Sequence, residues 1–208
     1  VGARAPGDTV RRGALEMGRL GSGGSGGPDT CGAALVGRGG GGCTDPIENG
    51  GTVVTSGMVI WSGTTIVSAV SGVASGVLLD SAHTSATLQS GGQATGTVVT
   101  TDGVLTVASG AVTVSDAVTG LEDVQAGGVT NLTLVLAGEQ TVEGVASRTV
   151  VSLTGQQIIS QGGTAIETAV LAGGQIMDAG TLTSAHEKSG GVVTVLSGGV
   201  ASADTISS

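Results

Sequence analysis

The sequence has no phenylalanine, no tyrosine and only one tryptophan among its 208 residues. A bulky core built on aromatic side chains is therefore excluded, because those residues supply the largest buried areas in such cores. The sequence also lacks an apolar run of about 18 residues, the length that predicts a membrane-spanning helix. It begins at Val1 and shows no basic segment followed by an apolar signal region, so we expect a fragment or a processed chain.

Positive charge is scarce in most of the chain. Residues 46–208 carry two cations, Arg148 and Lys188, against twelve acids, whereas residues 1–45 carry five arginines against four acids. So acidic a region cannot neutralise a phosphate backbone, which excludes nucleic acid as a partner and disfavours anionic lipid. The change in composition predicts a poorly ordered, low-complexity, glycine-rich leader over residues 1–45 and a repeat domain over residues 46–208.

Cysteine is also rare, and both cysteines, Cys31 and Cys43, lie in the leader. We expect a small disulfide loop between them if the protein meets an oxidising compartment. Because no histidine flanks them, we predict no zinc site, and we predict no cofactor elsewhere in the chain.

The residues that are abundant favour β-structure. The sequence has 41 glycines, and its apolar residues are Val, Ile, Leu and Ala interleaved with Thr and Ser. β-branched and small residues of this kind suit a pleated surface better than a helix interior. No helix-periodic segment separates the apolar runs, which argues against crossover helices between parallel strands.

A repeat of 17 to 19 residues organises the chain. Residues 90–108 are predicted to form a strand, a corner and a second strand, with a Gly-Gly corner at the start. Residues 161–178 repeat this pattern. Further copies start near Ser71, Ser109, Ala126, Gly144, Ala179 and Ser197. The glycines predicted to form corners are Gly91, Gly92, Gly103, Gly127, Gly128, Gly162, Gly163, Gly173, Gly174, Gly190, Gly191, Gly198 and Gly199.

Strands this short cannot form an isolated sheet, so we predict that successive copies stack as coils. Each strand then finds its hydrogen-bond partners in the coils above and below, with Val, Leu and Ile inside and Thr and Ser outside. At about 4.8 Å per coil, eight coils make a rod of roughly 40 Å. We expect residues 46–70 to form an irregular first coil in which Trp61 caps the hydrophobic stack, a sugar-stacking role being the alternative.

The repeats resemble the passenger repeats of AIDA-type and self-associating autotransporter adhesins, whose strand-loop-strand pattern is approximately SGGTAxxTxVxSGGxxxVxS. The resemblance covers roughly residues 49–208. The first matching copy contributes Ser90, Gly91, Gly92, Ala94, Thr97, Val99, Gly103 and Val107, and the second contributes Gly162, Gly163, Thr164, Ala165, Thr168, Val170, Gly173 and Gly174.

This resemblance implies an all-β, right-handed parallel β-helix, a β-solenoid displayed at the surface of a Gram-negative bacterium or secreted from it. It implies adhesion, autoaggregation or biofilm formation through self-association or binding to host-cell glycans, and modification of Ser and Thr by a glycosyltransferase. The chain departs from the family pattern in its glycine- and arginine-rich leader, and neither a translocator barrel nor a signal is recognisable.

The sequence offers little catalytic chemistry. His83 and His186 occupy different registers of their copies, and Glu122 and Asp123 would point to opposite faces of a strand. Polysaccharide-active β-helix enzymes cluster carboxylates with basic partners, which are scarce here, so we predict a non-enzyme and keep such an enzyme as the alternative.

Calcium binding is not expected, whereas a passive structural or ice-binding solenoid stays open as a weaker alternative. The aspartates near corners, Asp80, Asp102, Asp116, Asp178 and Asp204, are not spaced for a shared calcium cage, so we interpret the scattered carboxylates as solubilising. Solenoids that bind ice present threonine ladders on an outer face. Such a ladder could be formed here by Thr97, Thr113, Thr133, Thr149 and Thr168.

Overall fold

The computed structural model describes residues 15–17, 31–36, 47–54 and 56–207, which belong to two compact units, residues 1–56 and 57–208. In the first unit β1 (Leu15–Met17), β2 (Cys31–Val36) and β3 (Ile47–Val54) form a parallel three-stranded sheet. The rest of the predicted leader lies outside the described residues. The expected Cys31–Cys43 disulfide also lies outside them, because Cys43 is not described. The described residues form no helix capable of spanning a membrane.

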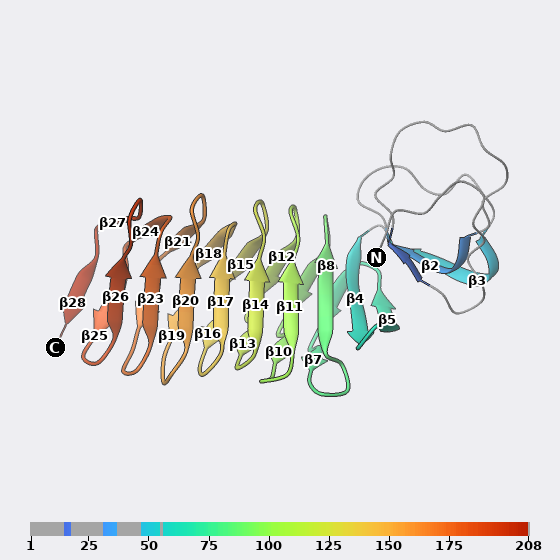
Figure 1. The fold of residues 1–208 in the computed structure, drawn as a ribbon, viewed down its shortest axis with the longest axis horizontal. Coiled ribbons are helices and arrows are strands. Elements are labelled where there is room, and N and C mark those ends of the chain that lie inside the picture. The colour runs from blue at the N-terminus through green and yellow to red at the C-terminus, as the bar shows by residue number, and fades with distance from the viewer. Residues whose placement is uncertain (1–14, 18–30, 37–46, 55, 208) are drawn as a thin grey trace. The chain divides into compact units, whose positions relative to one another are not determined.

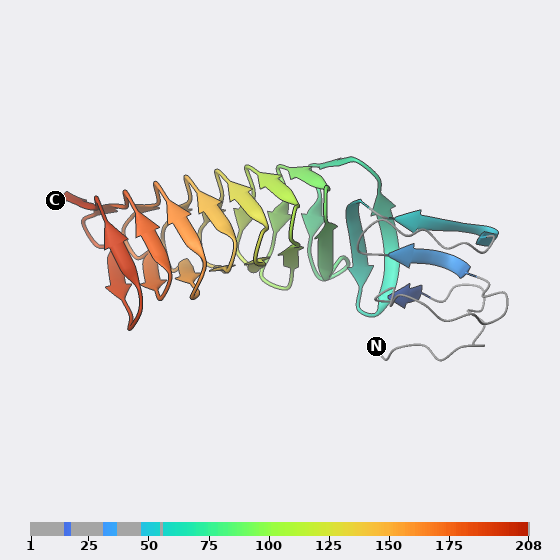
Figure 2. The same ribbon diagram turned by 90° about the horizontal axis from the view of Figure 1, so that it is seen from above.

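The second unit is a stack of coils, as Figures 1 and 2 show. Each full coil gives one short strand to each of three sheets, here called sheets I, II and III. Sheet I contains β5 (Thr65–Val70), β4 (Gly57–Ser62), β8 (Ser85–Gln89), β11 (Val104–Val107), β14 (Leu121–Val124), β17 (Glu139–Val142), β20 (Gln156–Ile159), β23 (Gln175–Asp178) and β26 (Val192–Val195).

The other two sheets contain eight strands each. Sheet II contains β6 (Val73–Ser75), β9 (Gln93–Thr95), β12 (Val112–Val114), β15 (Val129–Asn131), β18 (Val145–Ser147), β21 (Thr164–Ile166), β24 (Thr181–Thr183) and β27 (Val200–Ser202). Sheet III contains β7 (Leu78–Leu79), β10 (Val98–Val99), β13 (Ala117–Val118), β16 (Leu134–Val135), β19 (Val150–Val151), β22 (Ala169–Val170), β25 (His186–Lys188) and β28 (Thr205–Ser207).

Parallel pairing between coils confirms the predicted all-β solenoid with a repeat of about 18 residues. Gln93 pairs with Val112, nineteen residues on, and Val112 pairs with Val129, seventeen residues on. The backbone groups that such short strands cannot satisfy within one coil are thereby satisfied by the next. The predicted starts of the copies, such as Ser109 and Gly144, fall where sheet I passes into sheet II.

The first predicted coil is wrong. β4 and β5 form an antiparallel hairpin, and β4 also pairs antiparallel with β8, so residues 57–70 cover the edge of sheet I and make no coil. Trp61 lies half-buried in this hairpin. An antiparallel strand at the end of a parallel stack satisfies an edge that would otherwise be open to pairing with another chain.

The inner faces of the three sheets form the core. One apolar cluster extends from Met58 to Val151 along the stack, and a second extends from Ile159 to Ala185. Leu88, Leu105 and Ile176 are completely buried. In the coils around Glu122, Gln140 and Gln157, buried polar side chains share the interior with apolar ones.

Candidate functional site

The two glycines of a predicted Gly-Gly corner meet different structural requirements. Gly91 has a φ of 75°, a left-handed conformation that glycine adopts without strain. Gly92 is needed for space, because a Cβ atom there would lie 2.8 Å from the carbonyl oxygen of Gln89. The first glycine therefore turns the chain, and the second lets it pack on neighbouring backbone.

The other predicted glycines lie at two different corners of the coil. Left-handed φ angles occur at Gly91, Gly127, Gly162, Gly173, Gly190 and Gly198. Close backbone approach occurs at Gly92, Gly103, Gly128, Gly163, Gly174, Gly191 and Gly199. Gly103, Gly173, Gly174, Gly190 and Gly191 lie between sheets III and I, and the remaining predicted glycines lie between sheets I and II.

A third corner, between sheets II and III, was not predicted from the sequence. One left-handed residue forms it in every coil. Its N–H donates to a carbonyl of the following coil wherever the structure describes one, as Leu132 does to Ser147 at 3.0 Å. The residues in this column are Gly76, Gly96, Ser115, Leu132, Arg148, Glu167, Ser184 and Ala203. Because most of them have side chains, no glycine signal marks the corner.

The corner between sheets III and I carries a groove of about 420 Å³ on the outer surface. We call it the corner groove; its residues are Thr101, Asp102, Gly103, Val104, Thr119, Gly120, Leu121, Ala137, Gly138, Glu139, Thr154, Gln156 and Gln175. Glycine forms part of its lining, since a Cβ atom on Gly120 would lie 2.0 Å from the carbonyl oxygen of Thr100. The glycines of the groove therefore allow close backbone packing between neighbouring coils.

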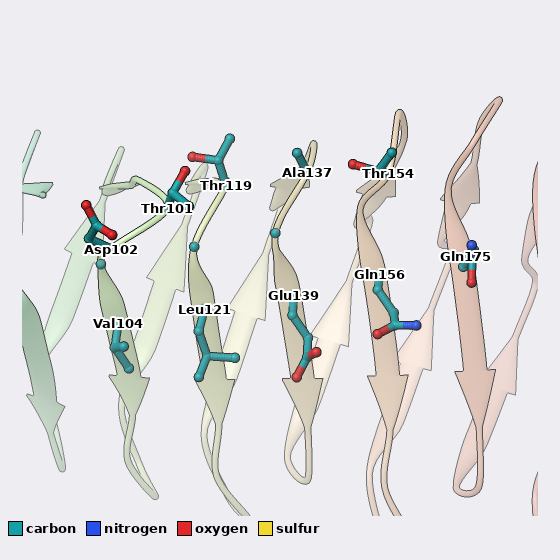
Figure 3. Close-up of a pocket in the computed structure, with 13 residues that line it drawn as sticks. Thr101, Asp102, Val104, Thr119, Leu121, Ala137, Glu139, Thr154, Gln156 and Gln175 are labelled. Carbon is teal, nitrogen blue, oxygen red and sulfur yellow. The ribbon is translucent and has the colours of Figure 1, made fainter.

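One wall of the corner groove is a ladder of planar polar side chains, shown in Figure 3. Glu139, Gln156 and Gln175 begin β17, β20 and β23 and are paired in register across the three strands. Thr141 donates a hydrogen bond to the Glu139 carboxylate at 3.3 Å. Among the described residues, neither glutamine side chain has a hydrogen-bond partner that would occupy it.

Much of the remaining lining belongs to the corner that precedes these strands. Thr101, Asp102, Ala137 and Thr154 are exposed there, and Thr119 is half-buried. Asp102 and Glu139 are the two carboxylates of the groove, and they come from coils two steps apart. The lining includes no Lys or Arg.

A second polar cluster lies inside the coils. Glu122, Gln140 and Gln157 are completely buried and occupy one inward column of sheet I. Nε2 of Gln140 donates to Glu122 Oε2 at 2.7 Å, and Nε2 of Gln157 donates to Gln140 Oε1 at 2.7 Å. The hydroxyl of Thr130 donates to Glu122 Oε1 at 3.2 Å, so the carboxyl group is bonded on both oxygens.

Burial raises the pKa of Glu122 to about 8, and repulsion from the Asp116 carboxylate acts in the same direction. The pKa of Asp116 is also raised, chiefly because burial disfavours its charged form. Asp116 Oδ1 accepts the N–H of Thr97 at 2.9 Å, while its Oδ2 has no partner among the described residues. A proton retained on this carboxyl pair at neutral pH reduces the buried charge.

These interior groups correct two predictions. The carboxylates are not all solubilising surface groups, since Asp116, Glu122 and Asp178 are buried. The threonines proposed for an outer ladder point inward. They are Thr97, Thr113, Thr133, Thr149 and Thr168, each at most 1% exposed.

The remaining candidates are not brought together. His83 follows β7 and lies 3.4 Å from Asp80, whereas His186 begins β25, six strands away in sheet III, and contacts Thr205 at 2.6 Å. Asp123 is half-buried on the face opposite Glu122. Within residues 57–207 no three His, Cys, Asp or Glu side chains are grouped as metal ligands would be.

The fold defines a β-solenoid of parallel coils. No protein-family model matches the chain, and no curated protein matches it. Among solved structures it is similar to the crystal structure of a TibC-catalysed, hyper-glycosylated TibA fragment, with 23% identity over 96% of this chain and 77% of that chain. The TM-score is 0.47, too low for this similarity to bear on function.

Proposed function

We propose that the chain is the repeat region of an adhesin passenger, displayed at a bacterial surface or secreted, that binds its targets through many weak polar contacts along the solenoid. The observation that carries this proposal is the long outer surface repeated coil after coil, with an open polar groove across five strands of sheet I. Repeated weak contacts summed along one rigid body can exceed any single contact by orders of magnitude.

The sequence resemblance adds details that belong to the same proposal. They are autoaggregation and biofilm formation, tethering at the outer membrane, and modification of exposed Ser and Thr by a glycosyltransferase. Exposed hydroxyl groups such as those of Thr101 and Thr154 are accessible to such an enzyme.

The alternatives have less support. The buried pair Asp116 and Glu122 is sealed from a polymeric substrate, and the groove carboxylates have no cationic neighbour in the lining, which a polysaccharide lyase or hydrolase would use. An ice-binding face built on the five threonines is excluded by their burial.

The test uses the whole chain coupled to beads at increasing surface density. We expect clumping of beads, or attachment to cells, to rise steeply with density, while the free chain in solution competes weakly, because multivalent contact is needed. Release of reducing ends from polysaccharide, or binding equally strong for free chain and beads, would contradict the proposal.

A further inference from the structure

The corner groove has the chemistry of a carbohydrate site, and we infer that it binds a neutral polysaccharide lying along the axis of the solenoid. This inference rests on the proposed function and assigns to it a ligand class and a location. The groove extends over β11, β14, β17, β20 and β23, which at about 4.8 Å per coil amounts to roughly 20 Å. A ligand that follows it must be an extended polymer and not a compact molecule.

The polar groups of the groove match a ligand rich in hydroxyl groups. The amides of Gln156 and Gln175 each offer a donor and an acceptor, and the Glu139 carboxylate offers two acceptors. These three groups recur at the coil spacing in one register column, and Thr101, Thr119 and Thr154 add hydroxyl groups at the corner that precedes the strands (Figure 3). Neighbouring hydroxyls of a sugar can bond such side chains coil after coil.

The charge of the groove restricts the ligand further. Its lining contains two carboxylates and no Lys or Arg, so a phosphate-, sulfate- or uronate-bearing polymer would be repelled. A basic polymer could use only Asp102 and Glu139, two coils apart, and would leave the amides and hydroxyls unpaired. A neutral glycan uses all of them, and the aliphatic side chains of Val104 and Leu121 offer a surface for its C–H faces.

The absence of aromatic residues sets the strength of binding. Sugar sites usually gain affinity from stacking on an aromatic ring, and none lines this groove. Each coil therefore contributes little, and affinity should grow with the length of the polysaccharide. This behaviour agrees with a passenger that works by summed weak contacts.

The experiment is affinity electrophoresis of the purified chain through gels containing uncharged, anionic or cationic polysaccharide. At least one uncharged polymer should retard the chain, and the double variant Gln156→Ala/Gln175→Ala should bind it roughly thirtyfold more weakly, since it loses at least two hydrogen bonds that cost about 1 kcal/mol each. The matched control is Gln93→Ala, an exposed glutamine at the same position of a sheet II strand, which should bind like the unmodified chain. Glu139→Gln keeps one of the two acceptors of the carboxylate and should weaken binding of a neutral polymer, by less than the double variant does.

Three results would overturn the inference. They are retardation by cationic polymer alone, with loss in Glu139→Gln; no retardation by any uncharged polymer; and an equal loss in Gln93→Ala. The bead assay separates the two proposals. If beads carrying the double variant still adhere, the groove assignment fails and the adhesin proposal stands. If the chain binds polysaccharide but its beads never adhere, the adhesin proposal fails and the groove assignment stands.

Discussion

The interior around Leu105 and the interior around Glu122 occupy the same column of sheet I, one coil apart, and differ completely in chemistry. Leu105 packs in an apolar cluster with Leu88 and Val107, whereas Glu122 is bonded to Gln140 and two threonine hydroxyls. The backbone ladder is the same in both places. The coil geometry therefore accepts either kind of core, and the polar side chains of this column hydrogen-bond to one another from coil to coil.

The largest expected effect is in the apolar region. Leu105→Ala should lower the free energy of unfolding by about 2–5 kcal/mol, because it removes buried apolar area and leaves a cavity that the paired coils cannot close. Urea unfolding followed by circular dichroism measures this change. The matched control is Leu78→Ala, whose side chain is 49% exposed and should cost far less. Equal losses in the two variants would show that the core is not where stability resides.

The second effect is the pH dependence of the polar region. The pKa of Glu122 is about 8 in the folded chain and near 4.5 when unfolded, so the unfolded chain loses this proton first. Stability should therefore be full below about pH 4.5 and fall as pH rises through about 8, on the order of 3 kcal/mol between pH 5 and pH 8. The raised pKa of Asp116 acts in the same sense at lower pH.

Glu122→Gln tests the cause of this fall. An amide extends the Gln140–Gln157 ladder without a charge, so the variant should lose most of the pH dependence above pH 5 in urea unfolding. Asp123→Asn, on the opposite face of the same strand, should keep it. A slope unchanged in Glu122→Gln would assign the pH dependence to other groups.

The position of Glu122 illustrates what the sequence could have shown. In β14, residues alternate between faces, so Glu122 shares a face with Val124, and Val124 is aligned with Val107 and Val142 of the neighbouring coils. That alignment indicates an inward Glu122. The expectation that carboxylates lie on the surface prevailed because buried acids are rare unless they are paired.

The corners also differ in how far the sequence predicts them. Gly-Gly pairs were predictable from sequence, since left-handed φ and close backbone approach both demand glycine there. The corner at Leu132 and Arg148 was not, because hydrogen bonding to the next coil holds ordinary residues in a left-handed conformation. Missing this corner removed one of the three strands from the predicted coil, and with it the correct facing of Thr133 and Thr149.

The smallest effect concerns a charged pair on the outer surface of the coils. Arg148 and Glu167 lie in adjacent coils of the left-handed column, 3.3 Å apart and more than half exposed. Because water screens such a pair, Arg148→Ala should change the free energy of unfolding by less than about 1 kcal/mol, and added salt should abolish the difference. Urea unfolding at low and high ionic strength measures it, with Lys188→Ala as a control cation. A loss comparable to that of Leu105→Ala would mean that exposed and buried polar contacts stabilise these coils alike, which the difference in their solvent exposure argues against.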